Sequence, residues 1–190
     1  MHSSIEPTEA RGGAMEDVTH NATNAAAHFM LEVFASVGAA KFDLTLTTFQ
    51  GEKESFRRAV PIERLNLNMP GILDRATSAQ LNVIIRPVPP PVFLQLDDLD
   101  SAACDRLQNV SFLILEVSPH SYQAWIAVVP SVEDKEFARR LKKGVGADPS
   151  ASGATRIAGS YNFKPKYMPD FPRQCARSRE LSVCQRPTEG

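Results

Sequence analysis

Two adjacent carboxylates at the end of a short apolar run are the residues best placed to do chemistry. Asp97 and Asp98 close the stretch PVFLQLDD, whose apolar residues are typical of a buried strand. Carboxylates on a rigid support provide the oxygen ligands that Mg²⁺ or Mn²⁺ prefers. Because successive strand residues point to opposite faces, both reach one site only if the strand stops or bends there. Asp98 and Asp100 share a face without a bend, and an acidic turn can also be a solvated cap.

Basic side chains are concentrated in the C-terminal part of the chain. Residues 1–134 carry 9 basic and 17 acidic side chains, whereas residues 135–190 carry 12 basic and 5 acidic ones. A basic part beside an acidic pair indicates a polyanionic partner, although a solvated helix with a basic tail has the same composition. Tyr161, Phe163 and Tyr167 alternate with the basic residues there, as stacking on a single strand requires. The same aromatic residues could equally anchor a long loop to the core.

The composition is that of one ordinary globular domain. The chain has 190 residues, of which 43% are hydrophobic and 23% charged. No apolar run approaches the roughly 20 residues of a membrane span, and the N-terminus lacks the features of a secretory signal. Three cysteines without a CxxC pair favour free thiols in a reducing cytoplasm. Neither a GxxxxGK[ST] motif nor a histidine cluster is present, which disfavours a P-loop ATPase and a zinc site.

Strand and helix patterns predict an α+β fold with a central, mostly antiparallel sheet flanked by helices. We expect a disordered leader over residues 1–20, one domain over residues 21–172 and a loose tail over residues 173–190. The predicted strands are residues 42–49, 81–86, 92–96, 111–117 and 122–129. The predicted helices are residues 24–37, 61–67, 71–79, 99–107 and 131–143, with Pro70 separating two of them. The charged residues 50–58 are expected to form a turn or hairpin tip.

Four sequence blocks in a fixed order carry a family likeness: LNVIIRP, LQLDDLD, FLILEVSPHSYQAWIAV and GADPSASGATRIAGSYNFKPKY. Through them, residues 24–172 resemble the RepB-like plasmid DNA primase domain, a divergent branch of the archaeo-eukaryotic primase superfamily. The resemblance implies an archaeo-eukaryotic primase-like fold and a nucleotidyltransferase that makes primers on a single-stranded DNA template from nucleoside triphosphates. It also implies a role in replication of a plasmid or mobile element, with a replicative helicase as a further partner.

The resemblance assigns metal binding to three carboxylates. It implies that Asp97 and Asp98, together with Asp148 in its Ala-Asp-Pro context, are catalytic and hold Mg²⁺ or Mn²⁺. Two such ions would lower the pKa of the attacking hydroxyl and stabilise charge on the leaving oxygen. No protein nucleophile is needed for that chemistry.

Nucleotide and DNA binding is expected from six polar residues, which are Arg86, Gln123, Arg156, Asn162, Lys164 and Lys166. Arg156 offers planar bidentate contacts to phosphate, whereas Lys164 and Lys166 offer point charges. Gln123 stands where many superfamily members have a histidine, and it cannot act as a cation or a titrating acid. Arg86 could as well be a surface arginine at the end of a strand.

Two other functions fit the same residues. One is a non-catalytic replication accessory protein that binds single-stranded nucleic acid through the basic residues, with salt-dependent affinity that is insensitive to the aspartates. The other is metal-dependent phosphodiester cleavage, because similar carboxylate clusters also serve nucleases.

Overall fold

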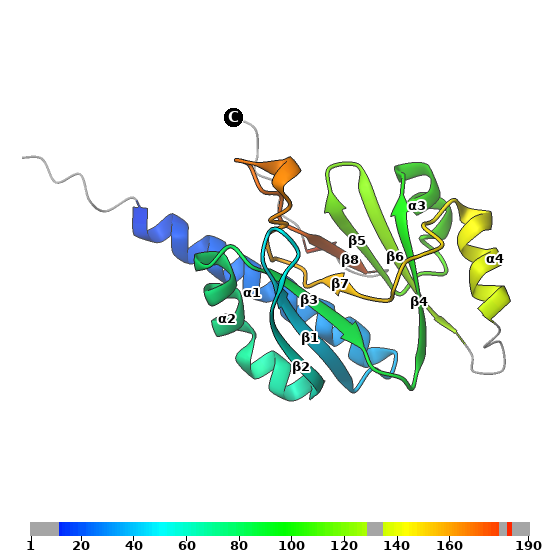
Figure 1. The fold of residues 1–190 in the computed structure, drawn as a ribbon, viewed down its shortest axis with the longest axis horizontal. Coiled ribbons are helices and arrows are strands. Elements are labelled where there is room, and N and C mark those ends of the chain that lie inside the picture. The colour runs from blue at the N-terminus through cyan, green and yellow to red at the C-terminus, as the bar shows by residue number, and fades with distance from the viewer. Residues whose placement is uncertain (1–11, 129–134, 179–181, 184–190) are drawn as a thin grey trace, which may run out of the picture.

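The computed structural model describes residues 12–128, 135–178 and 182–183 (Figure 1). In chain order, the elements of its first half are α1 (Gly12–Ser36), β1 (Lys41–Thr47), β2 (Lys53–Pro61), α2 (Ile62–Ser78), β3 (Asn82–Pro87) and β4 (Val92–Leu99). The second half adds α3 (Ser101–Leu107), β5 (Leu113–Ser118), β6 (Ser121–Val128), α4 (Lys135–Val145), β7 (Thr155–Arg156), the 3-10 turn η2 (Pro165–Tyr167), β8 (Cys175–Ser178) and β9 (Ser182–Val183).

The strands form two sheets. Sheet A has the order β2-β1-β3-β7 and sheet B has the order β4-β6-β5-β8-β9. Every strand pairing in both sheets is antiparallel. The α+β class and the antiparallel arrangement are therefore confirmed, but the strands are divided between two sheets where one central sheet was expected. The connection from β3 to β4 carries the chain from one sheet to the other (Figure 1).

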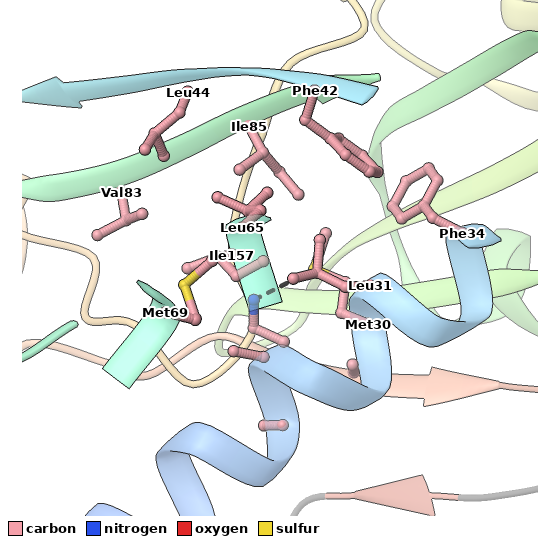
Figure 2. Close-up of a cluster of buried hydrophobic side chains, with 14 of the residues drawn as sticks. Met30, Leu31, Phe34, Phe42, Leu44, Leu65, Met69, Val83, Ile85 and Ile157 are labelled. Carbon is pink, nitrogen blue, oxygen red and sulfur yellow. Dashed lines mark hydrogen bonds between the residues drawn. The ribbon is translucent and has the colours of Figure 1, made fainter. Parts of the chain in front are cut away.

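The main core lies between sheet A and the helices α1 and α2. Alternate residues of β1 and β3 are buried because successive strand side chains point to opposite faces. Figure 2 shows these side chains pointing from the sheet toward the two helices. The backbone N–H of Ala158 also contacts the sulfur of Met30 in α1, at 3.2 Å. The buried residues labelled in this cluster are Met30, Leu31, Phe34, Phe42, Leu44, Leu65, Met69, Val83, Ile85 and Ile157.

Phe34 of α1 connects the cores of the two sheets. Its ring packs edge-on against Phe42 of sheet A, with the ring centroids 5.4 Å apart. The same ring packs edge-on against Trp125 of sheet B at 5.2 Å and Phe93 of sheet B at 5.7 Å. Trp125 is fully buried, so the expectation that it belongs to the core is confirmed. Edge-to-face contacts of this kind add to the burial of the rings themselves.

Both helices at the start of the domain are longer than their patterns predict. α1 begins at Gly12, within the segment expected to be a disordered leader, because a helix propagates readily once a later part is packed. α2 is one helix over Ile62–Ser78 with Pro70 inside it, so the predicted break is wrong. Its apolar face spans both sides of the proline, and burying that face outweighs a proline cost of about 3 kcal/mol.

Four strands were missed, β2, β7, β8 and β9, of which β7 and β9 are only two residues long. The charged residues expected to form a turn belong to β2, an edge strand whose side chains are mostly exposed. Edge strands often carry charges, which hides them from a search for apolar alternation. β8 lies in the stretch expected to be a loose tail, and it pairs with β5. The first four residues of the predicted helix 131–143 lie outside the described residues.

The described helices include none that is both long enough and apolar enough to cross a membrane. Cys104 is a buried thiol, whereas Cys175 is disulfide-bonded, so the expectation of free thiols is wrong for Cys175. Disulfide formation depends on which cysteine Cβ atoms the fold brings within about 4.5 Å, and spacing along the chain does not reveal this.

Candidate functional site

A β-bulge at the end of β4 brings Asp97 and Asp98 to the same site. Leu96 pairs with Ala124 of β6 and Leu99 pairs with Tyr122, so β4 contains one residue more than β6 between these pairs. Asp98 adopts the left-handed backbone conformation, with φ of 57°, and its N–H donates to Oδ1 of Asp97 at 2.9 Å. The strand therefore bends at the adjacent carboxylates, which is the condition under which both can face one site.

Asp148 is tied to the same bulge through the backbone. Its N–H donates to the carbonyl oxygen of Asp97 at 2.9 Å, which places the loop after α4 against the end of β4. The carboxylate of Asp148 is held by Ser150, whose backbone N–H and hydroxyl donate to it at 2.8 and 2.7 Å. The backbone of Asp148 thus lies beside that of Asp97, but the carboxylate of Asp148 is hydrogen-bonded to Ser150.

A cleft of about 600 Å³ opens between the two sheets beside the bulge. It is bordered by β3 and β7 from sheet A, by β4, β5 and β6 from sheet B, and by residues 162–167. Seven of the predicted site residues line it, namely Asp97, Asp98, Gln123, Arg156, Asn162, Lys164 and Lys166. Arg86 and Asp148 do not line it. The cleft thus joins the predicted acidic and basic groups from separate parts of the sequence.

Arg156 is positioned by a residue that the sequence analysis did not single out. Its Nε donates to Oδ1 of Asn82 at 3.0 Å, and the same oxygen accepts the N–H of Phe163 at 3.0 Å. Asn82 is 3% exposed, so its amide is committed to these bonds. One asparagine therefore orients the guanidinium and fixes the start of the lysine-bearing loop. Its signal in the sequence was a polar residue at the beginning of an otherwise apolar strand.

A chain of buried polar side chains connects the two sheets behind the cleft. Gln123 of β6 donates to Asp97, and its Oε1 accepts the hydroxyl of Thr155 from β7 at 2.7 Å. Gln174 donates from Nε2 to the carbonyl oxygen of Arg156 at 2.7 Å and to the Thr155 hydroxyl at 3.2 Å. Gln123 is therefore a positioning residue for Asp97, in agreement with its lack of charge. Thr155 and Gln174 were not predicted.

The segment that carries the cleft residues after β7 is packed closely on the domain. A Cβ at Gly159 would collide with the backbone carbonyl of Thr23 in α1, and Gly159 has a positive φ of 82°. A glycine is therefore required there. Phe163 is 5% exposed, and Tyr161 accepts a hydrogen bond from Arg173 at 2.6 Å. These two aromatic residues are anchors, whereas Tyr167 lines the cleft.

The two sides of the cleft have opposite electrostatic character. Burial raises the pKa of Asp97, and the charges of Asp98 and Asp148 raise it further, against hydrogen bonds from the Asp98 N–H and Gln123. Burial acts to raise the pKa of Tyr167 as well, but a hydrogen bond from Ser118 and the nearby Lys166 and Lys164 lower it below its usual value. Hence the side of the cleft with Asp97 and Asp98 carries negative charge, and the side with Lys164 and Lys166 favours a bound anion.

The donor atoms on the acidic side suit a divalent ion, although they are not assembled around one. Carboxylate oxygens are the ligands that Mg²⁺ and Mn²⁺ prefer. Within the described residues, no group of three His, Cys, Asp or Glu side chains is arranged to hold a metal ion. Ser150 engages the carboxylate of Asp148, so a three-carboxylate site requires that side chain to turn. The metal ligands therefore stay a prediction.

A second cavity, of about 360 Å³, lies between β2 and α2. Its polar lining consists of three arginines and Asn68, and it contains no carboxylate, histidine or cysteine. It therefore lacks the groups needed for metal or acid–base chemistry, and the cleft at Asp97 is the better candidate.

One family model matches the chain. Residues 48–174, more than half of the chain, match the RepB DNA-primase N-terminal domain. By sequence, no curated protein matches. The structure is similar to a crystal structure of primase RepB', with a TM-score of 0.66 and 22% identity over 86% of this chain. It is also similar to the catalytic domain of primase RepB' in complex with initiator DNA, with a TM-score of 0.65, 22% identity and the same coverage.

The two structural matches differ in how much of each RepB' structure this chain covers. This chain covers 58% of the first RepB' structure and 87% of the catalytic-domain structure. At 22% identity, the structural likeness establishes the fold alone, and it confirms the primase-like fold expected from the sequence. The family match covers Asn82, the carboxylates of the bulge and the whole cleft. This chain belongs to the RepB DNA-primase N-terminal domain family.

Proposed function

We propose that this chain is a DNA primase-type nucleotidyltransferase, which joins nucleoside triphosphates into primers on a single-stranded DNA template. The bulge at Asp97 and Asp98 is the observation that carries the proposal, because it sets two carboxylates opposite Arg156 across one cleft. A nucleoside triphosphate needs cations along its phosphates and ion-binding carboxylates at the α-phosphate. Membership of a primase family and the similarity to RepB' support the same assignment.

In the reaction, a 3′-hydroxyl attacks the α-phosphorus, a new P–O bond forms and pyrophosphate leaves. Asp97 and Asp98 would hold Mg²⁺ or Mn²⁺, joined by Asp148 once its carboxylate turns from Ser150. When bound, such ions lower the pKa of the attacking hydroxyl and neutralise charge on the leaving oxygen. Gln123 keeps the carboxylate of Asp97 in place through its amide.

The opposite side of the cleft binds the triphosphate. Arg156 contacts phosphate through its two terminal guanidinium nitrogens, because its bond to Asn82 uses Nε alone. Lys164 and Lys166 are exposed and neutralise the outer phosphates and the template backbone. The Oδ1 atom of Asn162, a residue that lines the cleft, finds no hydrogen-bond partner among the described residues. In this proposal it accepts a hydrogen bond from the sugar or base.

The natural setting would be replication of a plasmid or mobile element, with a helicase exposing the template. A non-catalytic accessory protein is the second candidate, since the carboxylates are not arranged as a three-ligand group within the described residues. That candidate keeps the basic side of the cleft and requires no turnover.

The test is a primer-synthesis assay with labelled nucleotides, single-stranded DNA and either Mg²⁺ or Mn²⁺. We expect labelled primers from the wild type and none from Asp97→Asn or Asp98→Asn. Asp105→Asn, which removes an exposed carboxylate from α3, is the matched control and should retain activity. An inactive wild type that binds single strands as well as Asp97→Asn does would favour the accessory role. Cleavage of labelled strands without nucleotides would indicate a nuclease.

A further inference from the structure

Four residues on neighbouring strands of sheet A form one row that starts in the cleft. The strand register pairs Arg156 with Ile84, Ile84 with Thr45, and Thr45 with Phe56. Directly paired residues point to the same face of a sheet. Leu44, the neighbour of Thr45, belongs to the core beneath the sheet, so the row lies on the open face.

The row leads out of the site already described. Arg156 and Ile84 line the cleft, whereas Phe56 lies on the edge strand β2. With strands about 4.8 Å apart, the three steps from Arg156 to Phe56 span about 14 Å. That is the length of a few nucleotides of extended single strand. Figure 1 shows α1 and α2 on the other side of these strands, so neither helix covers the row.

The outer end of the row combines an aromatic ring with a cation. Phe56 is 49% exposed, and Nζ of Lys53 lies 5.1 Å from the centre of its ring. The β1–β2 pairing is irregular here, because Leu46 pairs with Ser55 and Thr47 pairs with Lys53, which leaves Glu54 as an extra residue of β2. Lys53 therefore lies on the same face as Phe56. The carboxylate of Glu54 lies 3.7 Å from the guanidinium of Arg75 in α2. The acidic side chain is therefore directed to the helix side of the sheet.

Arg86 adds a second cation on the same face. It lies two residues after Ile84 on β3, so it shares the open face, and its side chain is exposed. Its register partner is Asp43, whose Oδ1 accepts the N–H of Ala59 at 2.8 Å. Arg86 was predicted to bind nucleotide or DNA, and it lies outside the cleft but on the surface that continues from it.

We propose that the open face of sheet A carries the nucleic-acid strand beyond the cleft, with a base stacked on Phe56 and phosphates bound by Lys53 and Arg86. This inference rests on the proposed function, because it takes single-stranded DNA as the ligand of the cleft. Aromatic stacking beside cations is how proteins bind single strands without reading sequence. A protein partner would need a larger apolar surface than one ring beside Thr45 and Ile84.

An exposed phenylalanine and lysine on an edge strand also occur without any ligand. Single exposed apolar residues are normal, and edge lysines prevent strands of other molecules from pairing. Two observations distinguish this pair from that case: its alignment with Arg156 through the register, and the pairing irregularity that turns Lys53 to the same face. The open face is also continuous with the cleft.

The test uses the full chain and single-stranded oligodeoxynucleotides that contain the fluorescent base 2-aminopurine at successive positions. Without nucleotides or metal, the wild type should quench 2-aminopurine at one position away from the cleft-bound segment. Phe56→Ala should abolish that quenching and weaken binding of long strands roughly 5- to 10-fold, the lower end for one stacked base. Phe56→Trp should retain both. Phe137→Ala, which removes a similarly exposed ring from α4, is the matched control.

The outcomes separate this inference from the proposed function. If Phe56→Ala binds long strands and quenches 2-aminopurine as the wild type does, the inference is wrong even if primers are made. If the quenching depends on Phe56 but no primers form, the strand path stands and the proposed function fails. Shortening the oligonucleotide until it no longer reaches Phe56 should remove the difference between the wild type and Phe56→Ala. A difference that persists on the shortest strand would overturn the inference.

Discussion

The two sheets contribute opposite halves of the candidate site. Sheet B supplies the carboxylates, through the bulge of β4 and the supporting amide of Gln123 on β6. Sheet A supplies Arg156 on β7 and the asparagine that orients it on β3. Where the sheets meet behind the cleft, the hydrogen bond from Thr155 to Gln123 joins them at 2.7 Å. Neither sheet alone carries both the anionic and the cationic group.

This division indicates how the protein keeps opposite charges close without direct pairing. Each charged side chain is held by neutral amides or backbone groups of its own side, and both side chains line the same cleft. Burial lowers the pKa of Arg156, while Tyr167 and Asp97 act to raise it, so the guanidinium remains charged. Changes on one side should therefore affect different steps from changes on the other.

The largest effect should come from the residue that packs against both sheets. Phe34→Ala would remove a fully buried ring that contacts Phe42 of sheet A and Trp125 of sheet B. We expect a loss of about 3–5 kcal/mol in the free energy of unfolding. Chemical denaturation followed by circular dichroism would measure it. A loss below 1 kcal/mol would show that Phe34 does not hold the two sheets together.

On the acidic side, Asp97→Asn should impair chemistry more than binding. We expect primer synthesis to fall roughly 10²- to 10³-fold, the range found when one electrostatic contact to a reacting centre is removed. Affinity for single-stranded DNA should stay within a factor of two of wild type, because the basic side is untouched. Parallel measurements of synthesis and fluorescence anisotropy would check both. An equal fall in the two would contradict the division between the sheets.

On the basic side, Arg156→Ala should mainly weaken binding of the nucleoside triphosphate. Loss of hydrogen bonds to a charged phosphate is worth about 1.5–3 kcal/mol, or roughly 10- to 150-fold in affinity. Nucleotide titrations of primer synthesis should show this as a higher KM. Arg106→Ala, on an exposed position of α3, is the matched control and should leave KM unchanged. An unaltered KM in Arg156→Ala would show that Arg156 does not bind the phosphates.

The link between the sheets offers a smaller test. Thr155→Val keeps the shape of the side chain but leaves Oε1 of the buried Gln123 without its donor. We expect a destabilisation of about 1–3 kcal/mol. A reduction in the rate of primer synthesis should accompany it, since Gln123 also holds Asp97. Thermal unfolding and primer synthesis would be compared with those of Thr77→Val, which alters an exposed threonine of α2 outside the link.

The smallest expected effect is on how the thermal stability of the metal-free protein depends on pH. Burial raises the pKa of Asp97 above its ordinary 3.8, so the native state holds this proton more tightly than the unfolded state does. Ionisation of Asp97 therefore lowers stability as pH rises from about 3.8 through the raised pKa. With a chelator present, Asp97→Asn should have a higher Tm than the wild type above that pH range. The difference in Tm should vanish at lower pH. A Tm difference that does not change with pH would contradict this cause.

Local sequence patterns predicted much of the fold. The elements that they did not predict depend on pairing between distant segments. The apolar runs predicted β1, β3, β4, β5 and β6, and the predicted helix 99–107 is α3, where Asp100 caps the helix by accepting the N–H of Ala103 at 2.7 Å. β2 and β8 carry little apolar alternation, and their positions are determined by their partners β1 and β5. The integrity of α2 across Pro70 likewise depends on the core that it covers.

The charged residues of the site were easier to predict than their supports. A pair of aspartates after a strand is visible in the sequence, and so is the requirement for a bend between them. Asn82, Thr155 and Gln174 act through hydrogen bonds to residues 18 to 81 positions away along the chain, which no spacing rule reveals. The local bond of Asp148 to Ser150 was equally invisible, because it depends on the side-chain conformation.

The most direct test is calorimetric titration of Mn²⁺ into the wild type and into Asp97→Asn, Asp148→Asn and Asp105→Asn. The account predicts that the wild type and Asp105→Asn bind Mn²⁺ equally, and that the two other variants bind at least about 10-fold more weakly. Equal binding by Asp97→Asn and the wild type, or no binding by the wild type even with nucleotide and template present, would contradict it.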